Sequence, residues 1–417
     1  MRALRRRVSG RTDLSGRARW ARWILTSPRT TTLGALSLRA WALDLFVARD
    51  PGTRPAPGDW IARDAPATWE VFLRSERCAL PLRSRLGRGA PTSLPSGPER
   101  VLKARATAEL QRILSVRGQL LQIQDLAERH GLEPIVLKGG VAALSGDEPV
   151  DVADVDVLLP REQAELLARL LDERGYRSRA VGSAAHLPMR FAPEVGQVEV
   201  HFAIEDLDHI GELRSRASPL PGFPGLWRLS PPDHVWHLLV HSVMTHPNRR
   251  GCLRDLLLAS SAVHECSSSD VEDITRRISE HSERRRLGAV LELAQALARG
   301  VAVVDSFSAE AAANYLLRTR LMRVARSRVL ALPVGTSVFA LLGSRSDREA
   351  AWTELSRGPE VSTWQFLAAT ERRWPWFGRV TRGFLRTLRL VLAWLVALPI
   401  AASARRIAAR SASTPSP

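Results

Sequence analysis

The sequence predicts an α+β fold in which a small mixed sheet is flanked by N-terminal helices and a larger C-terminal helical region. Three observations carry this prediction. Apolar residues recur every three or four positions from Val101 to His130, which is typical of an amphipathic helix. Two later stretches, VADVDVLLP and GQVEVHFAIED, alternate apolar and polar residues as half-buried strands do. After Pro231-Pro232 the pattern becomes helical again, so strands and helices are partly segregated along the chain.

The elements follow one another in a definite order. The first fifty residues are rich in arginine and broken by TSPRTTTLG, and Ala67 to Arg88 reads as a helix. Gly131 is a good stop for the next helix. The following segments are predicted to be a strand in PIVLK and a short helix in VAALSG. After them come the first acidic strand, in VADVDVLLP, a helix in REQAELLARLLDERGY, and the second acidic strand, in GQVEVHFAIED. Further helices are expected in DHVWHLLVHSVMTH, LRDLLLASSAVHE, about 271–299 and about 309–332.

A chain of 417 residues exceeds one typical domain. Residues 1–66 are predicted to be an arginine-rich segment ending in the linker RDPGTRPAPGDW. Residues 67–215 would form the α/β core with its preceding helices, and 216–335 a helical domain. Residues 336–417 would be a helical extension with a basic, apolar tail.

The formal net charge of +17 comes almost wholly from arginine, because Lys103 and Lys138 are the only lysines. An arginine excess beside abundant alanine and leucine indicates a composition bias, so nucleic acid is not the expected partner. RNA binding by the arginine-rich ends is a weaker alternative, and its sign would be a steep salt dependence. The three cysteines form no CxxC motif, which favours a reducing, cytoplasmic setting.

The stretch LRLVLAWLVALPIAASARR near the C-terminus leaves two interpretations open. Its apolar run from Leu390 to Ala404 covers about 15 residues, short of the ~20 that a spanning helix needs. Arginines flank it on both sides. It is either a terminal helix packed on the body of the protein or a peripheral membrane contact.

Two pairs of polar residues mark the expected site. Asp154 and Asp156 are two residues apart on one strand, and Glu199 and His201 are two apart on a later strand, so each pair shares a face. If the strands are neighbours, three carboxylates converge and repel one another unless a cation lies among them. The hard, oxygen-preferring ion for such a site is Mg²⁺, with Mn²⁺ as the alternative.

Lys138, Gly139 and Gly140 precede the first acidic strand. Glycines let a backbone approach a phosphate closely, and the start of the following helix adds partial positive charge. Lys138 adds a point charge. Together with the acids, these residues predict metal-dependent transfer from a nucleoside triphosphate (NTP).

Other catalytic patterns are weaker. His237 and His241 share a helix face, but no HExxH glutamate stands between them. They are therefore expected to be packed in the core or to face the Mg²⁺ site from behind its ligands, rather than to bind zinc. The chain has no GxxxxGK[ST] motif and no serine triad context, which excludes a P-loop enzyme and disfavours a serine hydrolase.

Lys138-Gly139-Gly140, then Asp154 to Leu159, then Val198 to His201 resemble the nucleotidyltransferase superfamily with the polymerase-beta-type fold. The match is closest to its bacterial branch of uncharacterised nucleotidyltransferases, over about Ala67 to Val263. His241 and Asp255 match that branch's histidine-bearing helix and the aspartate of the next helix.

The resemblance implies that Asp154 and Asp156 bind the metal and that Glu199 is a third ligand or the base for the acceptor hydroxyl. It also implies that Gly139 and Gly140 cradle the triphosphate. His201 shares the face of Glu199, and from this position it either orients the substrate or ends its strand. Val150 and Ala153 depart from the family pattern, which has an arginine and a glycine there.

We therefore expect a Mg²⁺-dependent nucleotidyltransferase that moves a nucleoside monophosphate from an NTP to the hydroxyl of an unknown acceptor, a small molecule or a macromolecule. The alternative is a catalytically degenerate nucleotide-binding or interaction module at a membrane surface or in a biosynthetic complex. The protein is expected in the cytoplasm, with peripheral membrane contact through the C-terminal helix.

Overall fold

The computed structural model describes residues 14–48, 66–87, 94–145, 150–178, 185–192, 196–204, 207, 209–245, 249–302, 304–319, 334–343, 348 and 375–413. Its helices are α1 (Leu14–Val47), α3 (Pro66–Glu76), α4 (Ala79–Gly87), α5 (Ser96–His130), α6 (Gly139–Ser145), α7 (Arg161–Glu173), α8 (Ile210–Arg216), α9 (Pro231–Val240), α10 (Leu253–His264), α11 (Ser268–Glu280), α12 (Arg284–Arg299), α13 (Ser308–Arg318), α15 (Val334–Leu342) and α18 (Pro375–Ser413). A π-helical turn, η2 (His241–Thr245), follows α9 directly.

The strands form one mixed sheet. They are β1 (Ile135–Val136), β2 (Asp154–Leu158), β3 (Arg177–Ser178), β4 (Arg190–Ala192), β5 (Gly196–His201), β6 (Ser218–Pro219) and β7 (Trp227–Arg228). Their order is β3-β4-β5-β2-β1-β7-β6. The pairs β2–β5 and β1–β7 are parallel, and the other neighbours are antiparallel. The predicted α+β fold with a mixed sheet is confirmed.

The two acidic strands are immediate neighbours at the centre of this sheet. Their register places Asp156 opposite Glu199 and Asp154 opposite Gln197. The intervening valines Val155, Val157, Val198 and Val200 point the other way and are at most 1% exposed. The period-two pattern therefore separates an apolar face from a polar face.

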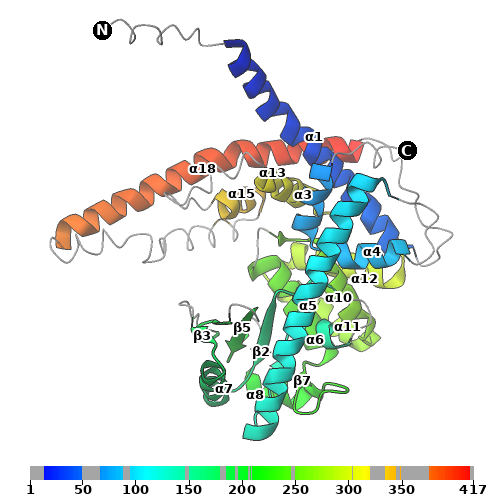
Figure 1. Cartoon of the computed structure of the whole chain (residues 1–417), viewed down its shortest axis with the longest axis vertical. Helices are drawn as coiled ribbons and strands as arrows, with labels where there is room; N and C mark the ends of the chain where they lie inside the picture. Colours follow the sequence, from blue (N-terminus) through cyan, green and yellow to red (C-terminus); the bar gives the residue numbers. More distant parts are fainter. Residues whose placement is uncertain are drawn as a thin grey trace, which may run out of the picture.

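Two apolar cores stabilise the two ends of the molecule. One lies between the sheet and α5, α6 and α7, and the other joins α1, α3, α4, α9, α10, α12, α13, α15 and α18. Figure 1 shows α5 running between the two ends, with the sheet beside its C-terminal part. This helix ends where Gly131 adopts a left-handed conformation, φ 62°, which is accessible to glycine at little cost.

Several boundaries differ from those expected. Residues 1–66 were expected to be an arginine-rich segment broken near Pro28, but α1 continues through that position, and Leu38, Leu45 and Phe46 are buried in the helical core. The linker RDPGTRPAPGDW, residues 49–60, lies outside the described residues. The helix expected at 67–88 is divided into α3 and α4 at Arg77, whose φ of 52° cannot continue a helix. The division into four domains stays a prediction.

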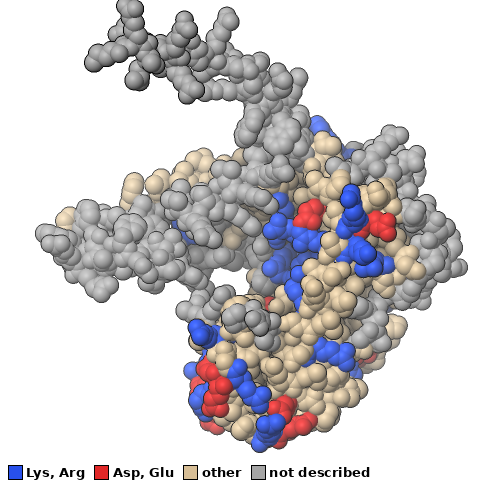
Figure 2. All heavy atoms as spheres, in the orientation of Figure 1, with Lys and Arg blue, Asp and Glu red and all other residues tan. Residues whose placement is uncertain are grey.

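The surface in Figure 2 mixes acidic and basic side chains around α7, while basic side chains gather beside the upper half of α5. At the opposite end, α18 packs against α13 and α15. Within the described residues, its segment Thr387–Ala412 is long and apolar enough to cross a membrane, with a mean hydropathy of 1.8. Length and composition alone make this weak evidence, because core helices of soluble proteins pass the same criterion.

Candidate functional site

The carboxylates of the central strands meet at one edge of a cavity of about 460 Å³. Asp154 and Asp156 come from β2, and Glu199 and His201 come from β5. All four side chains line the cavity together with Lys138. The ligand atoms of Asp156, Glu199 and His201 lie within 4.8 Å of one another. The predicted convergence of the two strands therefore occurs.

Asp154 is less tightly placed than the other acids. It lines the same cavity, but it does not belong to the cluster of three ligand atoms. Its Oδ2 lies 3.5 Å from Gln197 Nε2, its cross-strand neighbour. Asp156 and Glu199, with His201, thus form the compact part of the site.

Asp156 is the electrostatic centre of the cluster. Lys138 Nζ donates to Asp156 Oδ1 at 2.8 Å, and His201 Nε2 lies 2.9 Å from the same oxygen. Burial alone would raise the pKa of Asp156, but the Lys138 charge and the His201 contact outweigh burial and hold that pKa well below its ordinary value. Asp156 is therefore a carboxylate at neutral pH, although the residue is only 4% exposed.

The pKa of Glu199 is shifted in the opposite direction to that of Asp156. Burial, and then the neighbouring negative charge of Asp156, raise the pKa of Glu199 to about 7. The two carboxylates face each other across parallel strands, so both can be charged only at an energetic cost. A divalent cation among them would remove that cost.

The donor set fits such a cation. Two carboxylates and an imidazole are within reach of one another, and a third carboxylate, Asp154, lies on the same face of the sheet. Carboxylate oxygens suit Mg²⁺, and an added imidazole also suits Mn²⁺. The residues present therefore match the predicted metal chemistry, with Asp156 and Glu199 as the central oxygen donors.

Lys138 has an unusual backbone. Its φ is 51°, one of two positive values at non-glycine residues in the described chain. The half-buried His234 forms a hydrogen bond with the Lys138 backbone, and Leu137 N donates to Asp156 O at 3.0 Å. Such left-handed residues are uncommon and persist where the surroundings fix them. The backbone on both sides of the lysine is thus held against the site.

Gly139 and Gly140 are buried at the start of α6 and do not line the cavity. A Cβ added to Gly139 would lie 2.8 Å from Val152 Cγ2, and one added to Gly140 would lie 2.7 Å from Val136 Cγ1. These separations are shorter than van der Waals contact, so packing against the strands requires glycine at both positions. Their predicted role in cradling a triphosphate stays a prediction.

The cavity is also lined by residues of α9, η2, α10 and the segment leading into α10. These residues are His237, Val240, His241, Thr245, Arg249 and Arg254. His237 and His241 thus lie near the acids, which agrees with the second of their two expected placements. His237 is 7% exposed, and its Nε2 has no hydrogen-bond partner in the described part of the chain. Burial first, then the charges of Lys138 and His201, keep the pKa of His237 well below its ordinary value.

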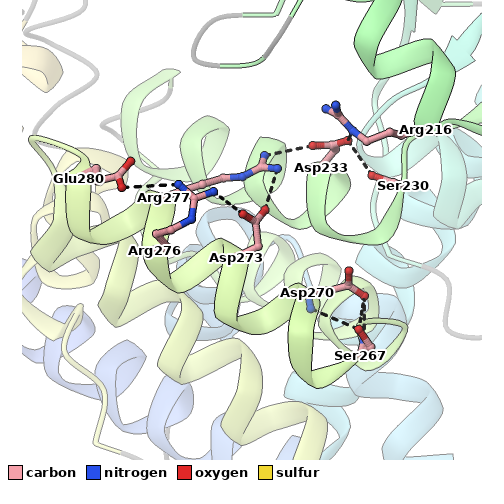
Figure 3. A network of polar contacts seen from close by, with 9 residues as sticks. All are labelled: Arg216, Ser230, Asp233, Ser267, Asp270, Asp273, Arg276, Arg277 and Glu280. Atoms are coloured by element: carbon pink, nitrogen blue, oxygen red, sulfur yellow. Dashed lines mark hydrogen bonds and ion pairs between the residues drawn. The ribbon is translucent and has the colours of Figure 1, made fainter.

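A buried ion network fixes the first turn of α9. The side chain of Asp233 is fully buried and accepts hydrogen bonds from Arg216, Ser230 and Arg277 at 2.9, 2.7 and 3.1 Å. Figure 3 shows Arg277 reaching Asp273 as well, at 2.8 Å. Because these residues belong to α9, α11 and the chain around α8 and β7, the network holds the histidine-bearing helix relative to the sheet.

Residues 71–299 match the family model of an uncharacterised nucleotidyltransferase, and this range covers more than half of the chain. The chain belongs to this nucleotidyltransferase family. None of the curated proteins compared with the chain matches it. The matched range contains every residue of the cavity, so the family assignment and the site refer to the same part of the molecule.

Two arginines that line the cavity of this nucleotidyltransferase were not predicted as site residues from the sequence. Arg254 Nε donates to the Asp151 carbonyl at 2.7 Å, and its NH1 pairs with Asp255 Oδ1 at 3.0 Å. Asp255, which the family pattern singled out, therefore orients an arginine at the cavity. The second is Arg249. Its pKa is lowered by burial, and then by the positive charges of Arg77 and Arg254.

The valine at position 150 leaves the site without a positive charge that Arg249 and Arg254 can supply. The resemblance leads one to expect an arginine at this position, but Val150 is 4% exposed and belongs to the helical core. Arg254 instead approaches the same corner from α10: its NH2 would be 3.5 Å from a Cβ added to Gly139. In the sequence, only the triplet Leu253-Arg254-Asp255 at the start of α10 indicates that Arg254 belongs to the site. Gln197 and His186, which also line the cavity, gave no recognisable signal.

Proposed function

We propose that the protein is a Mg²⁺- or Mn²⁺-dependent nucleotidyltransferase that uses an NTP as donor and an acceptor hydroxyl as nucleophile. The observation that carries the proposal is the register of β2 and β5, which sets Asp156 opposite Glu199 beside Asp154 on one face. Such a set of carboxylates binds divalent cations that also hold phosphate oxygens. Asp154, Asp156 and Glu199 would be the metal-binding residues, with His201 beside them.

The cavity offers an NTP both carboxylates and positive charge. Arg249 and Arg254 line it together with the acids. A triphosphate whose oxygens share a cation with the acids would also meet the positive charge of these arginines. Lys138 adds a further cation at the acidic edge. We infer that these three residues together supply the phosphate contacts expected of the arginine that is absent at Val150.

The reaction forms a bond between the acceptor oxygen and the α-phosphorus of the NTP and breaks the bond from that phosphorus to the bridging oxygen, so pyrophosphate leaves. A bound divalent cation would supply positive charge to the phosphate oxygens. Glu199 lies at the cavity edge and would take the proton of the acceptor hydroxyl. Asp156, held ionised by Lys138, would stay unprotonated throughout.

Nucleotide binding tests the donor half of this proposal. The protein is titrated with each α,β-methylene NTP analogue, with and without Mg²⁺ or Mn²⁺, in a calorimeter. We expect metal-dependent binding by the wild type and by Glu162→Gln, a control at an exposed glutamate of α7. We expect Asp156→Asn and Glu199→Gln to lose it. Binding that needs no metal, or that survives both substitutions, would refute the proposed site.

Transfer is tested separately. Cell extract is incubated with the protein, an α-labelled NTP and the metal, and labelled products are identified by mass spectrometry. A nucleotidyl adduct that the wild type forms and Asp156→Asn does not form supports the enzyme. A second candidate, a nucleotide-binding module without turnover, is favoured by the buried valine at position 150, where the resemblance leads one to expect an arginine. It predicts metal-dependent binding and no adduct with any extract.

A further inference from the structure

The long terminal helix α18 has two different apolar faces. One face carries small side chains that are buried, among them Ala393, Ala397, Ala401 and Ala404. These positions recur every three or four residues, so they form one side of the helix. This side packs against α13 and α15 of the body. The helix is thereby attached to the protein along its alanine face.

The other face carries large side chains that are exposed. Phe384, Leu388, Val391, Leu395 and Leu398 are spaced by four, three, four and three residues and are 38–65% exposed. This spacing aligns them in a single row, which we call the apolar stripe. In Figure 1 the first half of α18, which holds the start of the stripe, extends beyond the rest of the described structure. A continuous exposed row of this kind marks an interaction surface.

The charges of α18 are all of one sign. The helix contains Arg379, Arg382, Arg386, Arg389, Arg405, Arg406 and Arg410, and it contains no aspartate, glutamate or lysine. The arginines stand before and after an uncharged section, 390–404. A second copy of the same helix would bring seven further positive charges and no acid to pair with them. Anionic lipid head groups offer the complementary charge.

We propose that α18 docks the protein on the surface of a bilayer containing anionic phospholipid, with the apolar stripe inserted among the acyl chains and the alanine face holding the body. The helix would lie along the interface rather than span the membrane. Arg389 and Arg405 are sixteen residues apart, about 24 Å along a helix, whereas the hydrocarbon core is about 30 Å thick. Spanning would also strip the alanine face of its contacts with α13 and α15.

Flotation with vesicles tests this proposal on the full chain. We expect binding to phosphatidylcholine vesicles that contain phosphatidylglycerol, little binding to phosphatidylcholine alone, and weakening by salt. Val391→Ser combined with Leu395→Ser should lower the partition coefficient about tenfold or more. The matched control is Leu110→Ser with Leu114→Ser on α5, where the side chains are 42% and 58% exposed, close to the 50% and 61% of the stripe pair. The control should bind like the wild type.

Three outcomes would overturn the proposal. The first is equal binding by the stripe variant and the wild type, or no binding by the wild type. The second is a wild-type dimer in light scattering that the stripe variant converts to a monomer, without vesicle binding by either. The third is a fall in melting temperature for the stripe variant that the control does not share, because the stripe would then be an internal contact. None of these outcomes depends on the proposed nucleotidyl transfer.

Discussion

Lys138 Nζ lies 2.8 Å from Asp156 Oδ1, so one of only two lysines in the chain is the direct counter-charge of the most buried acid of the site. Arginine replaces lysine almost everywhere else in this sequence. The compact ammonium group of lysine can neutralise one carboxylate oxygen and leave room for a cation and phosphates. The larger, planar guanidinium group of arginine, with its five donors, would fill that room. The position of Lys138 therefore has a physical reason.

Replacing this lysine should destabilise the protein. Lys138→Met leaves Asp156 with His201 as its only remaining partner among the contacts described above, so we expect the free energy of unfolding to fall by about 1–3 kcal/mol. Affinity for an NTP analogue should fall as well. Lys103→Met is the control, because Lys103 is exposed on α5. Urea denaturation and calorimetry measure both effects, and equal stability of the two variants would contradict the inferred ion pair.

Removing the Glu199 charge should have the opposite effect on the metal-free protein. The pKa of Glu199 is raised to about 7 from 4.5. The stability that its protonated form contributes is therefore present below pH 4.5 and is lost as the pH rises through 7. At pH 8 we expect Glu199→Gln to raise the free energy of unfolding by on the order of 1 kcal/mol, discounted because the side chain is partly exposed.

The same variant should no longer respond to metal. Mg²⁺ should raise the melting temperature of the wild type and of Glu162→Gln, because it binds only the folded carboxylate cluster. It should leave Glu199→Gln nearly unchanged. A shift of equal size in Glu199→Gln would mean that the ion binds without this carboxylate.

A second buried glutamate should control stability without touching the site. Glu109 accepts hydrogen bonds from the amides of Ala79 and Leu80 at 3.1 and 2.7 Å. Burial nevertheless raises its pKa to about 7 from 4.5. Between these values the unfolded chain releases the proton and the folded chain keeps it, so stability falls as the pH rises. The wild type should lose on the order of 2–3 kcal/mol that Glu109→Gln does not lose. Denaturation curves from pH 4.5 to 8 measure this, and parallel profiles would exclude it.

The glycines should respond in opposite directions to alanine. Gly140→Ala places a Cβ 2.7 Å from Val136 Cγ1 in the sheet core and should cost about 1–3 kcal/mol. Gly118→Ala meets no atom within 4 Å inside α5 and should stabilise by about 0.5–1 kcal/mol. Melting temperatures of the two variants decide this, and a harmless Gly140→Ala would show that packing does not select this glycine.

The sequence by itself determined the local parts of this protein. Alternation around Asp154, Asp156, Glu199 and His201 set which side chains share a face, because successive residues of a strand point to opposite sides. Three- and four-residue periodicity located α5, α7 and α9 in the same way. Helix interruptions were harder to predict: α1 continues past Pro28, and the predicted helix over 67–88 is interrupted at Arg77.

Only the tertiary structure decided which other residues line the cavity with the acids. Periodicity places a residue on a face of its own helix, but it does not say which other element that face meets. Arg249 and Arg254 are about a hundred residues from Asp154 and reach the cavity because the Asp233 network fixes α9 and α10 packs beside it. The packing that requires glycine at 139 and 140, and the difference between the two faces of α18, could not be predicted for the same reason. Contacts between distant segments are set by the whole folded chain.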